Sequence, residues 1–117
     1  MEGYIIAYDL GTGGNKASLY GLDGRCIAEC FDAYPTHYIQ SGWHEQSPQD
    51  WWQAVVTSTR QLLTEAGVKK EAIVCCGISG HSLGVVPLDK RGRLLRSTTP
   101  IWSDSRAVKQ AQRFLRM

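Results

Sequence analysis

The chain has 117 residues, 43% of them apolar and 21% charged, with a formal net charge of +2 at pH 7. These values fit one ordinary soluble domain and exclude the concentrated basic surface that a nucleic-acid partner requires. No apolar stretch approaches the length of a membrane span, and the N-terminus lacks a secretory leader, so we expect a cytoplasmic protein with no membrane partner. The four cysteines include no C-x-x-C pair, which favours reduced structural thiols over a metal site.

The first third of the chain predicts an antiparallel meander of three strands. Residues 4–8 form a short apolar run that ends at Asp9 and a glycine-rich turn. A second strand is expected over residues 16–22 and a third over residues 25–33. They are joined by Asp-Gly, a dipeptide that favours tight hairpins.

A long helix is predicted after the meander. Residues 34–46 contain a proline, a glycine and several polar side chains, so we expect an extended connection without regular structure. Ser47 suits an N-cap, Pro48 suits the first helical position, and Asp50 completes a pattern similar to a capping box; a glycine at position 67 ends the helix. Apolar residues at helical spacing should cover the sheet, and the tryptophans at the helix entry should act as a hydrophobic staple: Trp43, Trp51, Trp52, Val55, Val56, Leu62, Leu63 and Ala66.

The second half predicts a further strand, two short candidate strands and a final helix. Residues 72–78 form a near-continuous apolar run, typical of a strand buried on both faces. Residues 84–88 and 93–96 are candidate strands around a turn, and residues 104–117 have a helical period. This order of elements predicts an α/β fold with one mixed sheet.

The turn after the first strand carries the strongest chemical signal. Asp9 stands at the end of the strand, and Gly11, Thr12 and Gly13 follow as small residues whose backbone N–H groups can face an anion. Asp9 can hold Mg²⁺ directly or through water, and Lys16 can add a positive charge. The turn therefore suits a phosphate group beside a divalent cation. The alternative is a plain β-hairpin in which the glycines serve the backbone alone.

Four later residues require an interpretation. His81 follows the predicted buried strand, where α/β sheets collect ligands, although a histidine that donates to nearby backbone under a loop is the simpler interpretation. Trp102 offers an aromatic wall, whereas Asp104 is interpreted by default as the cap of the last helix. Ser82 has the spacing of a G-x-S-x-G nucleophile, but no histidine follows it in these 117 residues, so a hydrolase whose triad partners lie beyond Met117 is the weakest alternative.

Several segments, in order, resemble one family. Residues 9–16 (DLGTGGNK) are similar to D-x-G-T-T/S-S-x-K/R, the first phosphate motif of the FGGY carbohydrate kinases, a family that includes xylulokinase, gluconokinase and glycerol kinase. Residues 42–52 (GWHEQSPQDWW) resemble its G-W-x-E-Q-x-P-x-x-W-W string, the most specific match. Residues 100–106 (PIWSDSR) resemble P-x-x-W-x-D-x-R, and residues 77–84 (GISGHSLG) fall where xylulokinases carry a G-I-x-G-Q-M-H-G-like segment.

The resemblance implies a fold, a reaction and a set of roles. The fold would be the ribonuclease H-like mixed sheet of the actin and sugar-kinase superfamily, and the reaction would be phosphorylation of a sugar or polyol hydroxyl by ATP with Mg²⁺. Asp9 would organise the metal while the turn cradles the phosphates. The residues that would border or support the sugar are His81, Ser82, Leu83, Trp102 and Asp104. The resemblance to xylulokinases makes D-xylulose one candidate sugar. Leu83 stands where they have a histidine and His81 replaces their glutamine, so a hydrogen-bonding group is missing at one place and a ring is present at another.

The family is several times longer than this chain. By resemblance, residues 1–117 would be the N-terminal portion of the first kinase domain, with the second domain and the catalytic aspartate beyond Met117. We therefore expect no catalytic base in this chain, no activity from it alone, and self-association through exposed edges. The alternative from another functional class is a non-catalytic actin-like or sugar-binding regulatory module.

Overall fold

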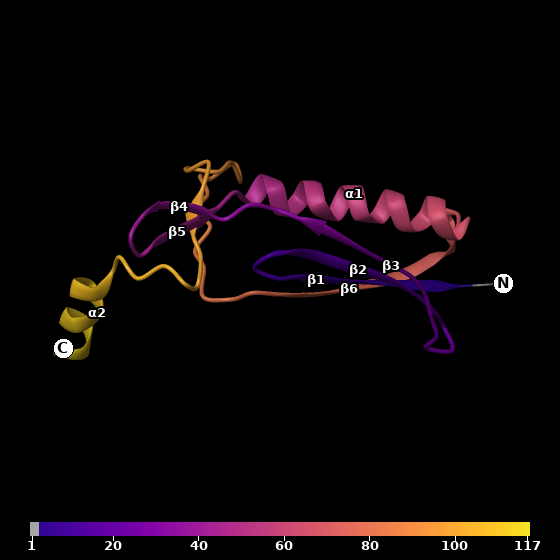
Figure 1. The fold of residues 1–117 in the computed structure, drawn as a ribbon, viewed down its shortest axis with the longest axis horizontal. Helices are drawn as coiled ribbons and strands as arrows, with labels where there is room; N and C mark the ends of the chain where they lie inside the picture. Colours follow the sequence, from indigo (N-terminus) through magenta and orange to yellow (C-terminus); the bar gives the residue numbers. More distant parts are fainter. Residues whose placement is uncertain (1–2) are drawn as a thin grey trace.

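A four-stranded mixed sheet forms the main layer of the molecule (Figure 1). The structure is a computed structural model that describes residues 3–117. The strand order is β3-β2-β1-β6, in which the first three strands form an antiparallel meander and β6 runs parallel to β1. The predicted meander and mixed α/β sheet are confirmed. The strands are β1 (Tyr4–Leu10), β2 (Gly14–Gly21), β3 (Cys26–Ala33) and β6 (Ile73–Gly80).

Helix α1 (Pro48–Ala66) lies along one face of this sheet and packs mainly on β2 and β3 (Figure 1). Its predicted ends are confirmed, because Ser47 is the N-cap residue and Gly67 adopts the left-handed conformation at the C-cap. The predicted capping box is wrong: the Ser47 hydroxyl makes no capping hydrogen bond, and Asp50 instead donates its backbone N–H to the Ser47 carbonyl at 3.0 Å.

The core lies between α1 and the first two strands. Its buried residues are Ile6, Tyr8, Ala17, Leu19 and Leu62. Leu62 was predicted to face the sheet, but the other fully covered positions of α1 are Ala54 and Ser58, whose small side chains let the helix approach β2 and β3 closely. The larger Trp52 faces solvent.

A second, three-stranded sheet contains β4 (His37–Gln40), β5 (Trp43–Gln46) and β7 (Thr99–Pro100) in the order β4-β5-β7. The prediction of an unstructured connection before α1 is therefore wrong. Gly42, at φ +77°, turns the chain between β4 and β5, and β5 finds its second partner more than fifty residues later in the sequence. The candidate strands over residues 84–88 and 93–96 reduce to one isolated bridge between Leu88 and Leu94.

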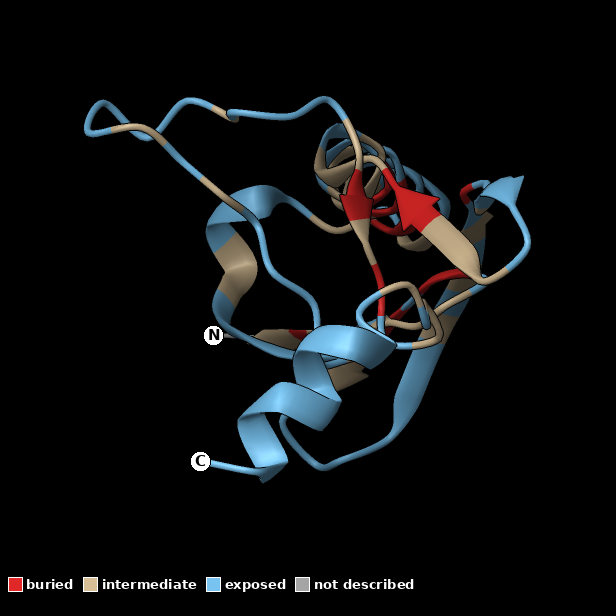
Figure 2. Ribbon diagram, turned by 90° about the vertical axis from the view of Figure 1, so that its left-hand side faces the viewer, coloured by how far each residue is buried: buried red, intermediate tan, exposed pale blue. Residues whose placement is uncertain are grey.

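Strand β6 is exposed, so the prediction that it is buried on both faces is wrong. After the short 3₁₀ helix η1 (Lys70–Ala72), every residue from position 74 to 80 is open to solvent. The reason is that α1 packs on β2 and β3, whereas β6 lies at the opposite edge of the sheet, beyond β1. Helix α2 (Val108–Leu115) is also exposed over its whole length (Figure 2). No helix within residues 3–117 is long and apolar enough to cross a membrane.

Candidate functional site

The glycine turn joins the carboxyl end of β1 to the start of β2. The Gly11 N–H donates to the Gly14 carbonyl at 3.0 Å and closes the turn. Within the described residues, the backbone N–H groups of Thr12 and Gly13 form no hydrogen bond, and a Cβ placed on Gly13 would meet no atom within 4 Å. The turn therefore has two backbone donors without a partner in the described structure and open space beside Gly13, as an anion site requires.

Two charged residues flank the turn on neighbouring strands. Asp9 and Lys16 are register partners, and Asp9 also lies beside Ser79 of β6. The Asp9 side chain is exposed at the strand end. The Lys16 ammonium lies 3.6 Å from the Glu29 carboxylate, also in solvent. Asp9 is thus available to a ligand, whereas Lys16 is directed along the sheet toward β3.

Tyr34 supports the turn from behind. Its phenol donates to the Gly11 carbonyl, and its backbone N–H reaches the Gly13 carbonyl at 3.4 Å. Burial, together with the nearby charge of Asp9, raises the pKa of Tyr34 to about 12. The phenol therefore stays protonated at neutral pH and remains a hydrogen-bond donor.

Two side chains from distant segments meet at Thr12. The Gln46 amide nitrogen donates to the Thr12 carbonyl at 2.6 Å, and the Trp102 indole N–H donates to the Thr12 hydroxyl at 2.8 Å. Gln46 comes from β5 and Trp102 follows β7, so the second sheet places both residues against the turn. The sequence prediction included Trp102 but assigned no role to Gln46.

A small hollow borders the other side of the turn at the end of β6. His81 donates its backbone N–H to the Leu10 carbonyl at 2.9 Å, and its ring meets Trp51 edge-on at a centroid distance of 5.3 Å. Burial lowers the pKa of His81, and its Nδ1 atom has no partner among the described residues. Ser82 and Leu83 also line this hollow, which measures about 190 Å³.

Behind Trp102 lies a cluster of charged residues around Glu45. Glu45 is 1% exposed and binds Arg96 at 3.0 Å, Arg106 at 2.7 Å and the Thr98 hydroxyl at 2.5 Å. Burial alone would raise the pKa of Glu45, but these hydrogen bonds and the two guanidinium charges lower it overall. The cluster thus holds β5, β7 and the segment after β7 together with an ionised carboxylate.

Asp104 belongs to this cluster, so its predicted role as a helix cap is wrong. The N-cap residue of α2 is Ala107. The Asp104 carboxylate instead accepts the backbone N–H of His44 at 2.9 Å and a forked contact from Arg106. Hydrogen bonds from Arg106 lower the pKa of Asp104 to about 2. The predicted hydrophobic staple also fails, because Trp43 stacks under the Arg106 guanidinium, 4.1 Å from the ring centroid.

The predicted residues therefore gather at one end of the main sheet. Thr12 touches Trp102 and Leu10 touches His81, so the turn lies between the aromatic wall and the hollow. Asp104 bonds to His44 and Arg106 and contacts neither the turn nor the hollow. The prediction assigned no role at the site to Tyr34, Glu45 or Gln46, although the string over residues 42–52 contained two of them. No cluster of three or more His, Cys, Asp or Glu side chains suited to a metal occurs in the described chain.

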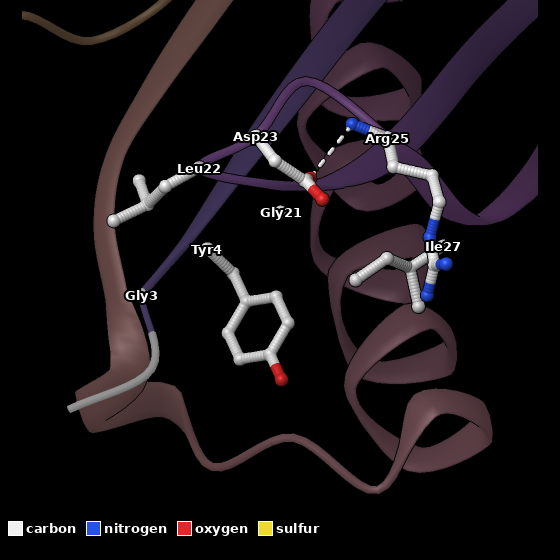
Figure 3. A pocket seen from close by; sticks show the side chains of 7 residues that line it. All are labelled: Gly3, Tyr4, Gly21, Leu22, Asp23, Arg25 and Ile27. Carbon is white, nitrogen blue, oxygen red and sulfur yellow. Dashed lines mark hydrogen bonds between the residues drawn. The ribbon is translucent and has the colours of Figure 1, made fainter.

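A second hollow of about 320 Å³ lies at the opposite end of β1 (Figure 3). Tyr4 and Gly21 line it together with the hairpin turn, where Asp23 accepts the backbone N–H of Arg25 at 3.0 Å. None of the predicted site residues contributes to this hollow. The site residues predicted from the sequence therefore lie at the glycine turn and around it, away from this second hollow.

The model of the N-terminal domain of the FGGY family of carbohydrate kinases matches residues 4–116. This chain belongs to that family. It is 33% identical over 110 residues to the xylulose kinase of Bacillus subtilis and 31% identical over 108 residues to the glycerol kinase of Agrobacterium fabrum. These matches cover 94% and 92% of the chain but 22% of either relative, so the chain spans about a fifth of their length.

Solved structures of the family agree with the fold. The gluconate kinase of Lactobacillus acidophilus superposes with a TM-score of 0.89 at 25% identity, over 99% of this chain and 23% of that one. The ligand-bound xylulose kinase from the same organism gives 0.87 at 26% identity, over 97% and 22%. The FGGY membership inferred from the motifs is confirmed.

Proposed function

We propose that this chain supplies the phosphate-binding turn and part of the sugar-facing surface of a cytoplasmic, ATP-dependent carbohydrate kinase. The observation that carries the proposal is the glycine turn: two free N–H donors and an exposed carboxylate lie between Trp102 and the hollow beside His81. We propose the ribonuclease H-like architecture as the frame of this site. The substrate class would be sugars or polyols, with D-xylulose as the first candidate.

The turn residues suit the phosphates of ATP and a Mg²⁺ ion. The N–H groups of Thr12 and Gly13 would bind phosphate oxygens, and the open space beside Gly13 lets the anion approach the backbone. A single carboxylate, Asp9, matches the preference of Mg²⁺ for one or two protein ligands beside water and phosphate. When bound, the ion would neutralise charge that develops on the transferred phosphoryl group.

The surface around the turn suits a polyhydroxylated ligand. The neutral His81 ring has a buried, unpartnered nitrogen, which would accept or donate a hydrogen bond to a hydroxyl. Trp102 is about half exposed and would pack its face on a sugar ring. Leu83, held at φ +66°, and Ser82 would complete the border and influence which sugar fits.

None of the residues at the turn or on the sugar-facing surface is suited to act as the general base of the reaction. The Asp104 carboxylate already accepts hydrogen bonds from His44 and Arg106, and its lowered pKa disfavours proton uptake. We propose that the base comes from another part of the kinase, so that the 117-residue chain has no turnover by itself. Phosphoryl transfer depends on positioning all partners, and half of a cleft does not achieve it.

A chimera tests the proposal. This chain would replace the matching segment of the Bacillus subtilis xylulose kinase, and ATP consumption would be measured with pentoses, hexoses and polyols. We expect sugar-dependent turnover from the chimera, and a loss of about 100-fold or more in kcat/KM for Asp9→Asn. The matched control is Asp23→Asn in the distant hairpin turn, which should keep the turnover of the parent chimera.

The outcomes separate the two functional classes. A folded chimera that binds sugar but consumes no ATP would contradict the kinase role and favour the regulatory module. Equal losses in both Asp variants would contradict the assignment of Asp9.

A further inference from the structure

Gln46 restrains the backbone of the turn through hydrogen bonds in a buried site. It is fully buried, and its amide nitrogen donates both to the Thr12 carbonyl at 2.6 Å and to the Thr36 hydroxyl at 2.8 Å. Its amide oxygen accepts the Trp51 indole N–H at 2.9 Å. Rotation of the amide would break three hydrogen bonds in a buried site, so the movement of the Thr12 carbonyl is restrained.

The side chain of Trp102 is held by a hydrogen bond to Thr12. The backbone beside it is anchored, because Ile101 donates to the His44 carbonyl and Asp104 donates to the Ile101 carbonyl. The Trp102 ring itself is 53% exposed, and its indole N–H donates to the Thr12 hydroxyl at 2.8 Å. The orientation of the aromatic wall therefore depends on where the Thr12 side chain stands.

We propose that Thr12 couples the two ligand sites: a ligand bound at the turn changes affinity at Trp102, and the reverse. This inference rests on the proposed function, which places phosphate at the turn and sugar at Trp102. Thr12 offers its N–H to the phosphate side, its carbonyl to Gln46 and its hydroxyl to Trp102. A shift of its backbone toward an anion moves the hydroxyl with it, while Gln46 limits the shift.

The residues on either side of Thr12 explain why the coupling should pass through Thr12. Gly11 and Gly13 on either side carry no side chain that would lock the turn, and Gly13 has open space around it. Tyr34 holds the carbonyls of Gly11 and Gly13, but among these three turn residues only Thr12 has a side chain that bonds to Trp102. Coupling between two sites is reciprocal, so the effect is measurable from either ligand.

The test measures affinities on the 117-residue chain. MgATP and D-xylulose are the two probes, and ¹⁵N NMR follows the turn amides and the four tryptophan indole signals. The coupling factor is the dissociation constant of MgATP without sugar divided by its value at saturating sugar. We expect a change of about fivefold or more in the wild-type chain and a factor near one in Thr12→Val, which keeps the shape but removes the hydroxyl.

Two further variants distinguish coupling from damage to the fold. Thr12→Ser retains the hydroxyl and should restore the coupling factor, whereas Thr64→Val, on the exposed side of α1, should leave it unchanged. Without any ligand, exchange of the Trp102 indole hydrogen should be roughly fivefold to tenfold faster in Thr12→Val than in the wild type or Thr12→Ser.

Each outcome decides a separate point. If both probes bind independently in the wild-type chain, the coupling is overturned while the proposed function stands. If coupling persists in Thr12→Val, the path through Thr12 is overturned. If MgATP moves no turn amide, the nucleotide site itself is contradicted, and the coupling falls with it.

Discussion

Strands β1 and β6 run side by side in the same sheet, yet one is covered and the other is bare. Their register places Ile6 beside Cys76 and Tyr8 beside Ile78. Tyr8 is 8% exposed, whereas Ile78 is 68% exposed. Tyr8, Trp52 and Ile78 line one open apolar groove of about 390 Å³, which shows where the cover given by α1 ends. Burial of a strand is therefore decided by what packs on it and not by its own apolar residues.

The largest contrast should appear between Leu62 and Ile78. Leu62→Ala opens a cavity beneath α1 and should lower the free energy of unfolding of the chain by about 3 kcal/mol. Ile78→Ala removes a side chain that is already in solvent and should cost less than about 0.5 kcal/mol. Urea unfolding measures both. Equal losses would show that β6 is covered in solution, as it would be in a self-associated form.

The charged cluster of the second sheet should be more sensitive than the charges on the main sheet. Glu45→Ala leaves Arg96 and Arg106 without their buried partner and should lower the free energy of unfolding by about 2–3 kcal/mol, since both arginines still reach solvent. Glu29→Ala removes the exposed pair with Lys16 and should cost about 0–0.5 kcal/mol. Similar values in chemical denaturation would contradict the structural role of Glu45.

The adjacent glycines Gly13 and Gly14 differ in the space that surrounds an added Cβ atom. A Cβ on Gly14 would lie 2.6 Å from the Asp32 carbonyl oxygen, so Gly14→Ala should cost about 1–2 kcal/mol of stability. Gly13→Ala meets nothing and should stay within about 0.5 kcal/mol. Thermal unfolding of the two variants decides the point. A more damaging change at Gly13 would show that the turn is closed by other groups.

The smallest of these contrasts should come from Tyr34 and should depend on pH. Tyr34→Phe removes the hydrogen bond to Gly11 and should cost about 1 kcal/mol at neutral pH. The raised pKa means that the folded chain retains the phenolic proton between pH 10 and about 12 while the unfolded chain releases it. The advantage of the wild type is thus fully present below pH 10 and disappears as the pH rises through 12. A difference that stays constant up to pH 12 would contradict this assignment.

The candidate site was predictable where its parts are close in the sequence. Asp9 and the three turn residues after it form a continuous segment, and their position at a strand end follows from local pattern. Gln46 could not be assigned a role at the turn in this way, because its partner Thr12 lies 34 residues before it. The role of Asp104 was predicted wrongly for the same reason. Its local sequence indicated a helix cap, but its carboxylate accepts the backbone N–H of His44, which comes from a distant strand.

The sequence by itself determined the meander, the helix from Pro48 to Ala66 and the glycine turn, because turn dipeptides, helix ends and apolar periods act between near neighbours. Tertiary structure decided that residues 43–46 form a strand, that β6 is exposed and that Thr12 meets Trp102. These outcomes depend on which distant segment supplies a hydrogen-bond partner or a cover, and contacts of that kind leave no periodic trace in the residues that receive them.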